Sequence, residues 1–318
     1  MAAVSPGKIL VTGGAGFIGS HLVDALLASG FSVRVVDDFS TGSLTNLPGD
    51  HPDLEVVEAD VAHAQVAEQA VAGVAAVVHL AAVASVQASV ENPAVTHSAN
   101  FISTLHLLEA CRRHGVSRFI YASSAAVYGN GAPLPISEEA AVQPLTPYAV
   151  DKLTSEYYLD FYGRQYGLEP AIFRFFNVFG PRQDPSSPYS GVISIFVDRA
   201  LTRRPLTIYG DGRQSRDFIY VADLVGILVK AITAPALAAG PVNVGTGSRI
   251  TLLELVEQLQ ELLGYKLEVH HEEARQGDVK HSRADISRLD KRFAFEPKYT
   301  FAAGLQHLVK HVVAGGNV

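Results

Sequence analysis

The stretch "VTGGAGFIGSHLVDALLASG", residues 11–30, decides the fold of this 318-residue chain. It sets the end of a β-branched run, a cluster of glycines and an amphipathic helical pattern in direct succession. Gly14, Gly16 and Gly19 fit the spacing G-x-G-x-x-G, and Gly13 starts the wider G-x-x-G-x-x-G. Such glycines allow a tight turn and close approach of the backbone to a pyrophosphate. A plain strand-to-helix turn is the alternative, but the flanking strand and helix favour a dinucleotide site.

Short apolar runs alternate with amphipathic stretches as far as residue 177. Near-continuous apolar strands separated by helices indicate a parallel sheet covered on both faces. The right-handed crossover between parallel strands then predicts a doubly wound sheet of the Rossmann type in an α/β protein. The predicted strands are 8–13, 32–38, 54–60, 74–82, 116–124 and 169–177, and the helical patterns lie near 17–30, 63–72, 92–113 and 146–167.

The regular alternation ends at "NVFGPRQDPSSPYSG" (177–191), which is rich in Pro, Gly and Ser and indicates a functional loop. A helix at 221–232, a strand at 241–247 and a helix at 251–264 follow. We therefore expect a smaller, interleaved C-terminal substrate domain. The predicted boundaries are 1–176 for the Rossmann domain, with 213–247 returning to it, and 177–212 with 248–318 for the substrate domain.

The composition gives no reason to expect a nucleic-acid or membrane partner, because the net charge is -7 and the pI is about 5.9. Cys111 is the single cysteine, so no intrachain disulfide forms, which suits a reducing cytosol. The N-terminus does not resemble a signal peptide, and the apolar tract 71–86 is too short to span a bilayer. We expect a soluble, cytoplasmic protein. No metal site is expected, since the adjacent His270 and His271 would point to opposite faces of a strand.

The carboxylates that follow the glycines indicate which dinucleotide binds. An acidic residue at the end of the second strand binds the adenosine ribose in such sites. Asp37 lies at that point, with Asp38 beside it. Two carboxylates would repel a 2′-phosphate, so the sequence favours NAD over NADP. Asp60, at the end of the third strand, is expected near the adenine.

Further motifs follow in order: "TGGAGFIG" (12–19), "HLAA" (79–82), Asn100, "SSAAVYG" (123–129), "YAVDK" (148–152), "RFFNVFGPRQ" (174–183), "SRDFIYVAD" (215–223) and "VNVGTG" (242–247). In this series, which covers almost the whole chain, the protein resembles the extended short-chain dehydrogenase/reductase family, close to its nucleotide-sugar 4-epimerases. The resemblance implies that NAD is bound by Gly13, Gly16, Phe17, Ile18, Gly19, Asp37, Asp38, Ser40, Thr41, Gly42, Asp60, Val61, Leu80, Ala81, Ala82, Asn100, Ser123, Tyr148 and Lys152.

Tyr148 and Lys152 lie four residues apart in a helical stretch, so they share one face. A chance surface pair is the alternative interpretation. The resemblance instead implies that both are catalytic and that Ser124 hydrogen-bonds the same substrate oxygen as Tyr148. A phenol with a pKa of about 10 is a poor base at neutral pH. We expect the ammonium of Lys152 and a positive nicotinamide to lower the pKa of Tyr148.

The two residues after Ser124 narrow the reaction. Related sugar dehydratases carry Asp-Glu there, and decarboxylating relatives carry glutamate at the second position. This chain has Ala125 and Ala126, so elimination lacks its acid and base. The resemblance therefore implies a 4-epimerase: Tyr148 removes the 4-OH proton, the C4 hydrogen leaves as hydride to tightly bound NAD, and the hydride returns to the other face of the 4-keto sugar.

The family's contacts to the diphosphate match Arg216 and Arg275, whose planar forks suit phosphate. The resemblance places Asn177 near the diphosphate and sugar, and Asp278 at the nucleotide ribose or beside Arg275. Each arginine could instead be an ordinary surface charge. The remaining expected substrate contacts are Ala84, with Ile193 and Phe196 at the uracil, and Thr146 and Tyr128 as pocket-lining positions, although core packing explains Tyr128 equally well.

Ser282 carries the inference about the sugar. In the resembling epimerases a tyrosine at this position restricts the enzyme to plain hexoses, and a small residue leaves room for an N-acetyl group. Ser282 thus indicates UDP-N-acetylglucosamine/UDP-N-acetylgalactosamine interconversion, with UDP-glucose/UDP-galactose as a further pair. An exposed turn serine is the alternative.

Three competing functions remain open. They are a UDP-glucuronate 4-epimerase, a keto-sugar reductase, and a non-catalytic NAD-sensing protein. The resemblance further implies a homodimer formed by the helices near 92–113 and 148–165, and a role in polysaccharide biosynthesis.

Overall fold

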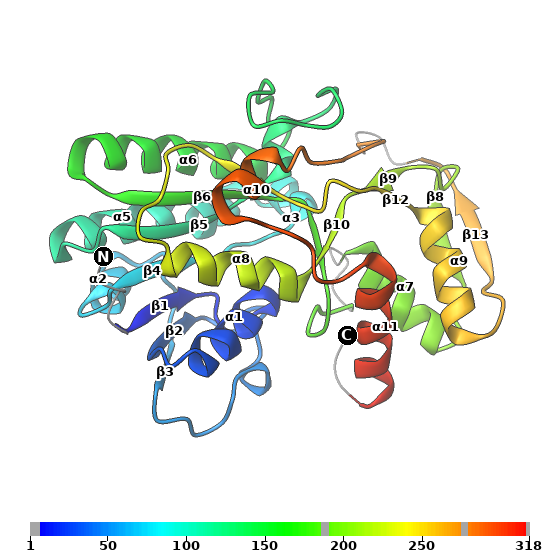
Figure 1. The fold of residues 1–318 in the computed structure, drawn as a ribbon, viewed down its shortest axis with the longest axis horizontal. Helices are drawn as coiled ribbons and strands as arrows, with labels where there is room; N and C mark the ends of the chain where they lie inside the picture. Colours follow the sequence, from blue (N-terminus) through cyan, green and yellow to red (C-terminus); the bar gives the residue numbers. More distant parts are fainter. Residues whose placement is uncertain (1–6, 186–190, 275–278, 316–318) are drawn as a thin grey trace. The chain divides into compact units, whose positions relative to one another are not determined.

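The computed structural model describes residues 7–185, 191–274 and 279–315. Its main sheet has seven strands in the order β11-β6-β5-β4-β1-β2-β3 (Figure 1). The pairs β1–β2, β1–β4, β2–β3 and β4–β5 are all parallel. This arrangement confirms the predicted doubly wound sheet. The strands are β1 Ile9–Thr12, β2 Val33–Asp37, β3 Leu54–Glu58, β4 Ala76–His79, β5 Arg118–Ser124, β6 Glu169–Phe175 and β11 Val242–Val244.

Helices cover both faces of this sheet. The helices α2 (Ala64–Val71), α5 (Ser103–His114) and α6 (Pro147–Tyr166) pack on one face, where a continuous apolar core joins them to the strands. Figure 1 shows α1 (Phe17–Ala28) and α8 (Val221–Thr233) on the opposite side from α5 and α6. Cys111 is fully buried in the core, which raises its thiol pKa to about 12 and makes it inert.

The predicted helix near 92–113 is interrupted. The chain forms α3 (Val86–Glu91), α4 (Pro93–His97), a π-helical turn (Ser98–Ile102) and then α5. A π turn inserts an extra residue into the helical repeat and re-aims the side chains around it. Here it carries the buried Asn100, whose amide oxygen accepts from Val83 N–H at 2.8 Å and whose amide nitrogen donates to Val83 O at 3.3 Å. The interruption thus fixes the loop after β4.

The chain divides into two compact units. Unit 1 comprises residues 1–128, 142–174 and 225–242, and unit 2 comprises 129–141, 175–224 and 243–318. Of the stretch 213–247, which the sequence assigns to the first domain, residues 225–242 fall in unit 1 and the rest in unit 2. The assignment of the substrate role to unit 2 stays a prediction.

Unit 2 is built from short strand pairs and helices. Its aromatic core packs Phe179, Phe218, Tyr220 and Phe301 against one another, and Gly304 of α11 lets the helix approach the rings of this core closely. The strand pairs are β7 (Asn177–Phe179) with β10 (Phe218–Tyr220), β9 (Ser215–Arg216) with β12 (Ile250–Thr251), and β8 (Leu206–Tyr209) with β13 (Val269–Glu272); the helices are α7 (Val192–Leu201), α9 (Leu252–Leu263), α10 (Ser287–Phe293) and α11 (Phe301–Val313).

Short helical turns complete the chain at η1 (Leu44–Asn46) and η3 (Ala125–Tyr128). None of the helices in the described ranges is long and apolar enough to cross a bilayer.

Gly19 lies where the fold leaves no space for a side chain. A Cβ there would lie 2.1 Å from Gly13 O, because α1 packs directly on the glycine turn. We expect Gly19→Ala to lower the free energy of unfolding by about 2 kcal/mol or more, as overpacking does, and to abolish dinucleotide binding. Urea unfolding and cofactor content measure both.

Gly226→Ala is the matched control. Gly226 also lies inside a helix, but it is exposed and a Cβ there meets open space. Alanine in an exposed helix interior should stabilise by roughly 0.5–1 kcal/mol. Equal effects of the two substitutions would contradict the packing argument.

Candidate active site

The glycine turn between β1 and α1 forms a cradle in which side chains at its glycine positions would be crowded. Gly13 has a φ of +66°, and a Cβ on it would lie 2.8 Å from Ala81 N. A Cβ on Gly16, the N-cap of α1, would lie 3.3 Å from Gly13 O. The turn lies between β1 and β4, where the strand order reverses and where open α/β sheets bind nucleotides. The free N–H groups of α1 point out of its N-terminus there, which suits a pyrophosphate.

Asp37 ends β2 and faces this turn. Its carboxylate accepts hydrogen bonds from Ala15 N–H and Phe39 N–H, each at 2.9 Å. Burial raises the pKa of Asp37, and the backbone hydrogen bonds offset part of that shift. The exposed Asp38 accepts from Ser40 N–H and Ser40 Oγ, so it orders the loop that carries Thr41 and Gly42.

The other predicted cofactor residues follow the carboxyl ends of strands in unit 1. Asp60 and Val61 come after β3, and Asp60 accepts from Ala62 N–H at 2.8 Å. Leu80, Ala81 and Ala82 follow β4. Phe17 and Ile18 begin α1 beside the cradle. The residues present thus fit NAD: a glycine-rich turn, a helix N-terminus and the carboxylate of Asp37, which is predicted to bind the ribose, lie at one edge of the sheet.

Two further residues of the predicted NAD site, Asn100 and Ser123, direct their side chains into hydrogen bonds within the protein. Asn100 holds Val83, as described above. Ser123 is buried and donates its hydroxyl to Glu156. Direct cofactor contacts from either side chain therefore stay predictions.

Ser124, Tyr148 and Lys152 come together in unit 1. Ser124 ends β5, and the other two lie one turn apart near the start of α6, which packs on β5. Thr146 caps this helix by accepting from Ala149 N–H at 3.4 Å, and Pro147 occupies its first turn. The Lys152 Nζ lies 5.8 Å from the centroid of the Tyr148 ring and donates to Ala122 O at 2.8 Å. The predicted catalytic set is thus one local cluster.

The pKa of Tyr148 shifts in the direction opposite to the sequence prediction. Burial raises it because it disfavours the phenolate, and a hydrogen bond with Ser124 offsets part of the rise. The Ser124 oxygen already accepts from Ala126 N–H at 3.2 Å, so its proton is free to point at the phenol. The prediction of a lowered pKa was wrong for the protein's own residues, because burial of the Tyr148 phenol has the largest influence on its pKa.

Lys152 is only 4% exposed, and burial lowers its pKa to about 8, with the Asp151 charge acting in the opposite sense. His79, at the end of β4, lies close enough to interact with it. Its ring nitrogens contact Thr12 Oγ1 at 2.7 Å and Thr104 Oγ1 at 3.0 Å. Burial and the Lys152 charge lower the pKa of His79 to about 3. His79 is therefore neutral and serves as a buried link between β1, β4 and α5.

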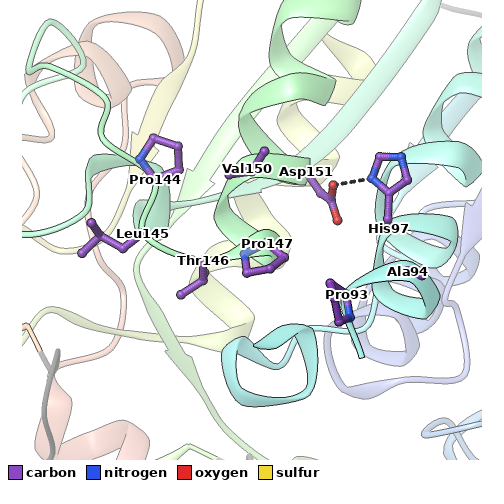
Figure 2. A pocket seen from close by; sticks show the side chains of 9 residues that line it. All are labelled: Pro93, Ala94, His97, Pro144, Leu145, Thr146, Pro147, Val150 and Asp151. Carbon is purple, nitrogen blue, oxygen red and sulfur yellow. Dashed lines mark hydrogen bonds and ion pairs between the residues drawn. The ribbon is translucent and has the colours of Figure 1, made fainter. Parts of the chain in front are cut away.

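A hollow of about 620 Å³ lies beside the start of α6 (Figure 2). Thr146, predicted to line a pocket, lines this one. Figure 2 shows Asp151 of α6 facing His97 of α4, with 2.7 Å between Oδ1 and Nδ1. Tyr128, by contrast, is buried and its hydroxyl accepts from Arg174, so packing accounts for it. The other lining residues are Pro93, Ala94, Pro144, Leu145, Pro147 and Val150.

In unit 2, Arg216 and Ser282 belong to one neighbourhood. Ser282 N–H donates to Ser215 O at 3.0 Å, and Arg216 follows Ser215 in β9. The Arg216 side chain donates to Ser215 O at 3.1 Å and Lys280 O at 3.4 Å. Ser282 is 9% exposed, so it is not the freely exposed turn serine of the alternative interpretation. Asn177 is exposed in β7.

The predicted uracil contacts Ile193 and Phe196 are buried on α7 and pack in the core of unit 2. Their uracil role stays a prediction. Ala84 is exposed in the loop after β4. Arg275 and Asp278 lie outside the described residues.

One buried group next to the catalytic residues was not predicted. Glu156 lies one turn beyond Lys152 on α6 and pairs with Arg174 of β6, and both side chains are buried. The spacing of Tyr148, Lys152 and Glu156 along one helix face was a signal in the sequence. The sequence held no comparable signal for the partner of Glu156, Arg174, which lies 18 residues further along the chain.

The comparisons with known proteins agree with this architecture. Residues 9–245 match the model of the NAD dependent epimerase/dehydratase family. The chain is 37% identical over 303 residues to a putative UDP-glucose 4-epimerase of Methanocaldococcus jannaschii, covering 95% of this chain and 97% of the relative.

Two solved structures are similar over nearly the whole chain. The UDP-N-acetylglucosamine 4-epimerase from Methanobrevibacter ruminantium, in complex with UDP-N-acetylmuramic acid, has a TM-score of 0.93 at 38% identity and covers 98% of this chain and 100% of that chain. The UDP-glucose 4-epimerase from Thermus thermophilus, in complex with NAD, has a TM-score of 0.87 at 37% identity, covering 96% and 98%.

The fold and the site define a Rossmann protein with a Ser-Tyr-Lys set beside an NAD cradle. Within that class, the chain belongs to the NAD dependent epimerase/dehydratase family.

The buried charge of Lys152 predicts a gain in stability on its removal. The pKa of Lys152 falls from 10.5 to about 8 on folding. The unfolded chain therefore binds the lysine proton more tightly than the folded chain does. The free-energy cost of burying the charged lysine on folding is absent above pH 10.5 and reaches its full value below pH 8. At about 1.4 kcal/mol per unit, less about 1 kcal/mol for the bond to Ala122 O, Lys152→Met should stabilise the cofactor-free protein by roughly 2 kcal/mol at pH 7.

Urea unfolding at pH 7 of protein stripped of cofactor measures this change. Lys291→Met, on an exposed lysine of α10, should shift the free energy of unfolding by less than about 0.5 kcal/mol. A Lys152→Met protein less stable than the wild type would contradict the argument.

Proposed function

We propose that this protein is an NAD-dependent UDP-sugar 4-epimerase. Two observations carry the proposal. Ser124, Tyr148 and Lys152 form one cluster, and the two residues that follow Ser124 in the sequence are Ala125 and Ala126. The cluster can move a hydroxyl proton, and the two alanines offer no carboxylate for elimination. The similarity to two 4-epimerases of known structure, at 37–38% identity over nearly the full chain, supports the same activity.

Each catalytic residue has a distinct task. When bound in the cradle, NAD supplies the acceptor and donor of the C4 hydride. Tyr148 takes the proton of the sugar 4-OH and later returns it. Ser124 donates to the phenol oxygen and so favours the phenolate. Lys152, held on Ala122 O, provides a positive charge near the phenol, which gains in effect because it is desolvated.

The substrate of this proposal is UDP-N-acetylglucosamine, interconverted with UDP-N-acetylgalactosamine, and UDP-glucose is a further substrate. Ser282 supports the N-acetyl sugar because its side chain is small. Its backbone is tied to Ser215, next to Arg216, the proposed diphosphate ligand. The buried, inert Cys111 suits a reducing compartment, and we propose that the enzyme works in the cytoplasm in polysaccharide biosynthesis.

Proton NMR of the purified protein with each UDP-sugar and no added cofactor tests the proposal. We expect conversion of UDP-N-acetylglucosamine to its 4-epimer. Ser282→Tyr should reduce this conversion by about tenfold or more and leave UDP-glucose turnover within about threefold, because the tyrosine would fill the space of the N-acetyl group.

The UDP-glucose reaction doubles as the folding control for this variant. Turnover of UDP-glucose alone by the wild type would contradict the role of Ser282. Conversion of UDP-glucuronate alone, or of no sugar even with added NAD, would contradict the proposed substrate or the proposed activity.

We further propose that the enzyme is a homodimer joined through the apolar face of α3, α4 and α6. The helices pack on one another, and their outer faces expose Val90, Val95, Val150, Tyr157 and Phe161. Val150, Tyr157 and Phe161 repeat at helical spacing, so they form one stripe. Such a contiguous exposed apolar patch is typical of a protein–protein interface.

Charge on this face should separate the subunits. Val95→Glu combined with Val150→Glu should convert the dimer to a monomer in light scattering after gel filtration, because a C2 interface repeats each charge twice. Val313→Glu on α11 is the matched control, since Val313 is 69% exposed and Val95 is 67% exposed. A wild-type monomer, or a dimer that survives the double substitution, would contradict the proposed interface.

A further inference from the structure

The first turns of α6 present one stripe of polar side chains to the end of β5. Tyr148, Lys152 and Glu156 are spaced four residues apart and so lie on the same face. Each has a partner among three successive strand residues: Ser124 for Tyr148, Ala122 O for Lys152, and the Ser123 hydroxyl for Glu156. Two of these contacts belong to the catalytic cluster. The third, between Ser123 and Glu156, has no role in the chemistry described above.

Glu156 is held in turn by Arg174 on β6. The guanidinium Nε lies 2.9 Å from Oε1 and Nη2 lies 2.6 Å from Oε2, so the fork binds both carboxylate oxygens. The pair is almost fully enclosed, with Glu156 5% and Arg174 4% exposed. Burial alone would lower the pKa of Arg174, but the bonds to Glu156 outweigh it and shift that pKa upward. The Arg174 guanidinium therefore stays charged.

Arg174 has a second partner, and it lies beyond Ser124. Its Nη1 donates to the Tyr128 hydroxyl at 2.9 Å, and its guanidinium carbon lies 4.8 Å from the centroid of the Tyr128 ring. Tyr128 ends the η3 turn that begins directly after Ser124. The Glu156–Arg174 pair thus binds the chain at two points, the Ser123 hydroxyl and the Tyr128 hydroxyl. Ser124 lies between the two points.

Stability does not explain such an arrangement well. A buried ion pair loses much of its Coulomb energy to desolvation, and a well-packed apolar pair is often equally stable. What the pair does provide is a fixed geometry, because every donor and acceptor has a defined direction. Rigid support of this kind is what a reacting group needs.

We propose that Glu156 and Arg174 are positioning residues that hold Ser124 against Tyr148. The ion pair ties the end of β5 and the η3 turn to the helix that carries the catalytic tyrosine. This inference rests on the proposed epimerase activity, and its tests include a readout that does not depend on turnover.

Ser123→Ala is the most selective variant, because it removes one tie and leaves the ion pair intact. We expect kcat to fall about 5- to 20-fold with KM within about twofold, since Ser124 would no longer be held at the bonding position. Ser155→Ala is the control. Ser155 is a fully buried α6 serine whose hydroxyl bonds Asp151 O and Thr104 instead. Its kcat should stay within about twofold of the wild type.

Ultraviolet titration of Tyr148 provides the readout without turnover. The difference between each protein and its Tyr148→Phe derivative gives the ionisation of this phenol, which lies near Lys152 and Tyr121. Ser123→Ala should move that ionisation to higher pH by about half a unit or more, because the bond from Ser124 would be weakened. Ser155→Ala should not move it.

A double variant, Glu156→Leu with Arg174→Met, removes the network without leaving an unpaired charge. We expect it to fold and bind NAD while kcat falls by about tenfold or more and the phenol titrates at higher pH. Unchanged titration and kcat in folded Ser123→Ala and in the double variant would overturn the proposal. An inactive wild type would count against the epimerase assignment, whereas the titration would still decide the positioning role.

Discussion

The docking of α6 along the end of β5 is the interaction on which the site depends. One helix face brings Tyr148 and Lys152 to strand residues that include Ser124, so three chemical groups belong to two packed elements. The spacing of the helix repeat sets the distance between Tyr148 and Lys152. The strand sets where Ser124 lies. The packing of α6 against β5 therefore decides whether Ser124, Tyr148 and Lys152 are held in one arrangement.

The contact between α6 and β5 buries charged groups, and their desolvation costs free energy that an apolar core would avoid. Lys152 keeps a charge where burial lowers its pKa to about 8, and His79 beside it is held neutral. The Glu156–Arg174 pair adds two more charges in the same layer. Apolar residues at these positions would be easier to bury. A protein that retains them trades stability for a defined electrostatic environment around one phenol.

Much of this architecture could be predicted from the sequence, because continuous apolar runs and the glycine pattern are local signals. The seven strands of the main sheet fall within the predicted ranges, and Tyr148 and Lys152 share a helix face as their spacing requires. The short strand pairs of unit 2 were not predicted, and β7 begins in the stretch expected to be a loop. The π turn at Ser98–Ile102 could not be predicted, since its helical pattern looks continuous. The Glu156–Arg174 pair was missed because a pattern along one helix does not reveal which side chain of a neighbouring strand meets it. The direction of the Tyr148 pKa shift likewise depends on burial and on the hydrogen bond with Ser124, which only the packed structure shows.

The most direct test of the central claim follows the hydrogen on C4. Epimerisation of a UDP-sugar deuterated at C4 would be carried out in ordinary water and the product examined by NMR and mass spectrometry. The proposed chemistry predicts that the deuterium stays on C4 of the epimer, because the hydrogen that leaves as hydride returns to the same carbon. Replacement of the deuterium by solvent hydrogen would mean that C4 is deprotonated instead, and the role assigned to Tyr148 and the NAD cradle would be contradicted.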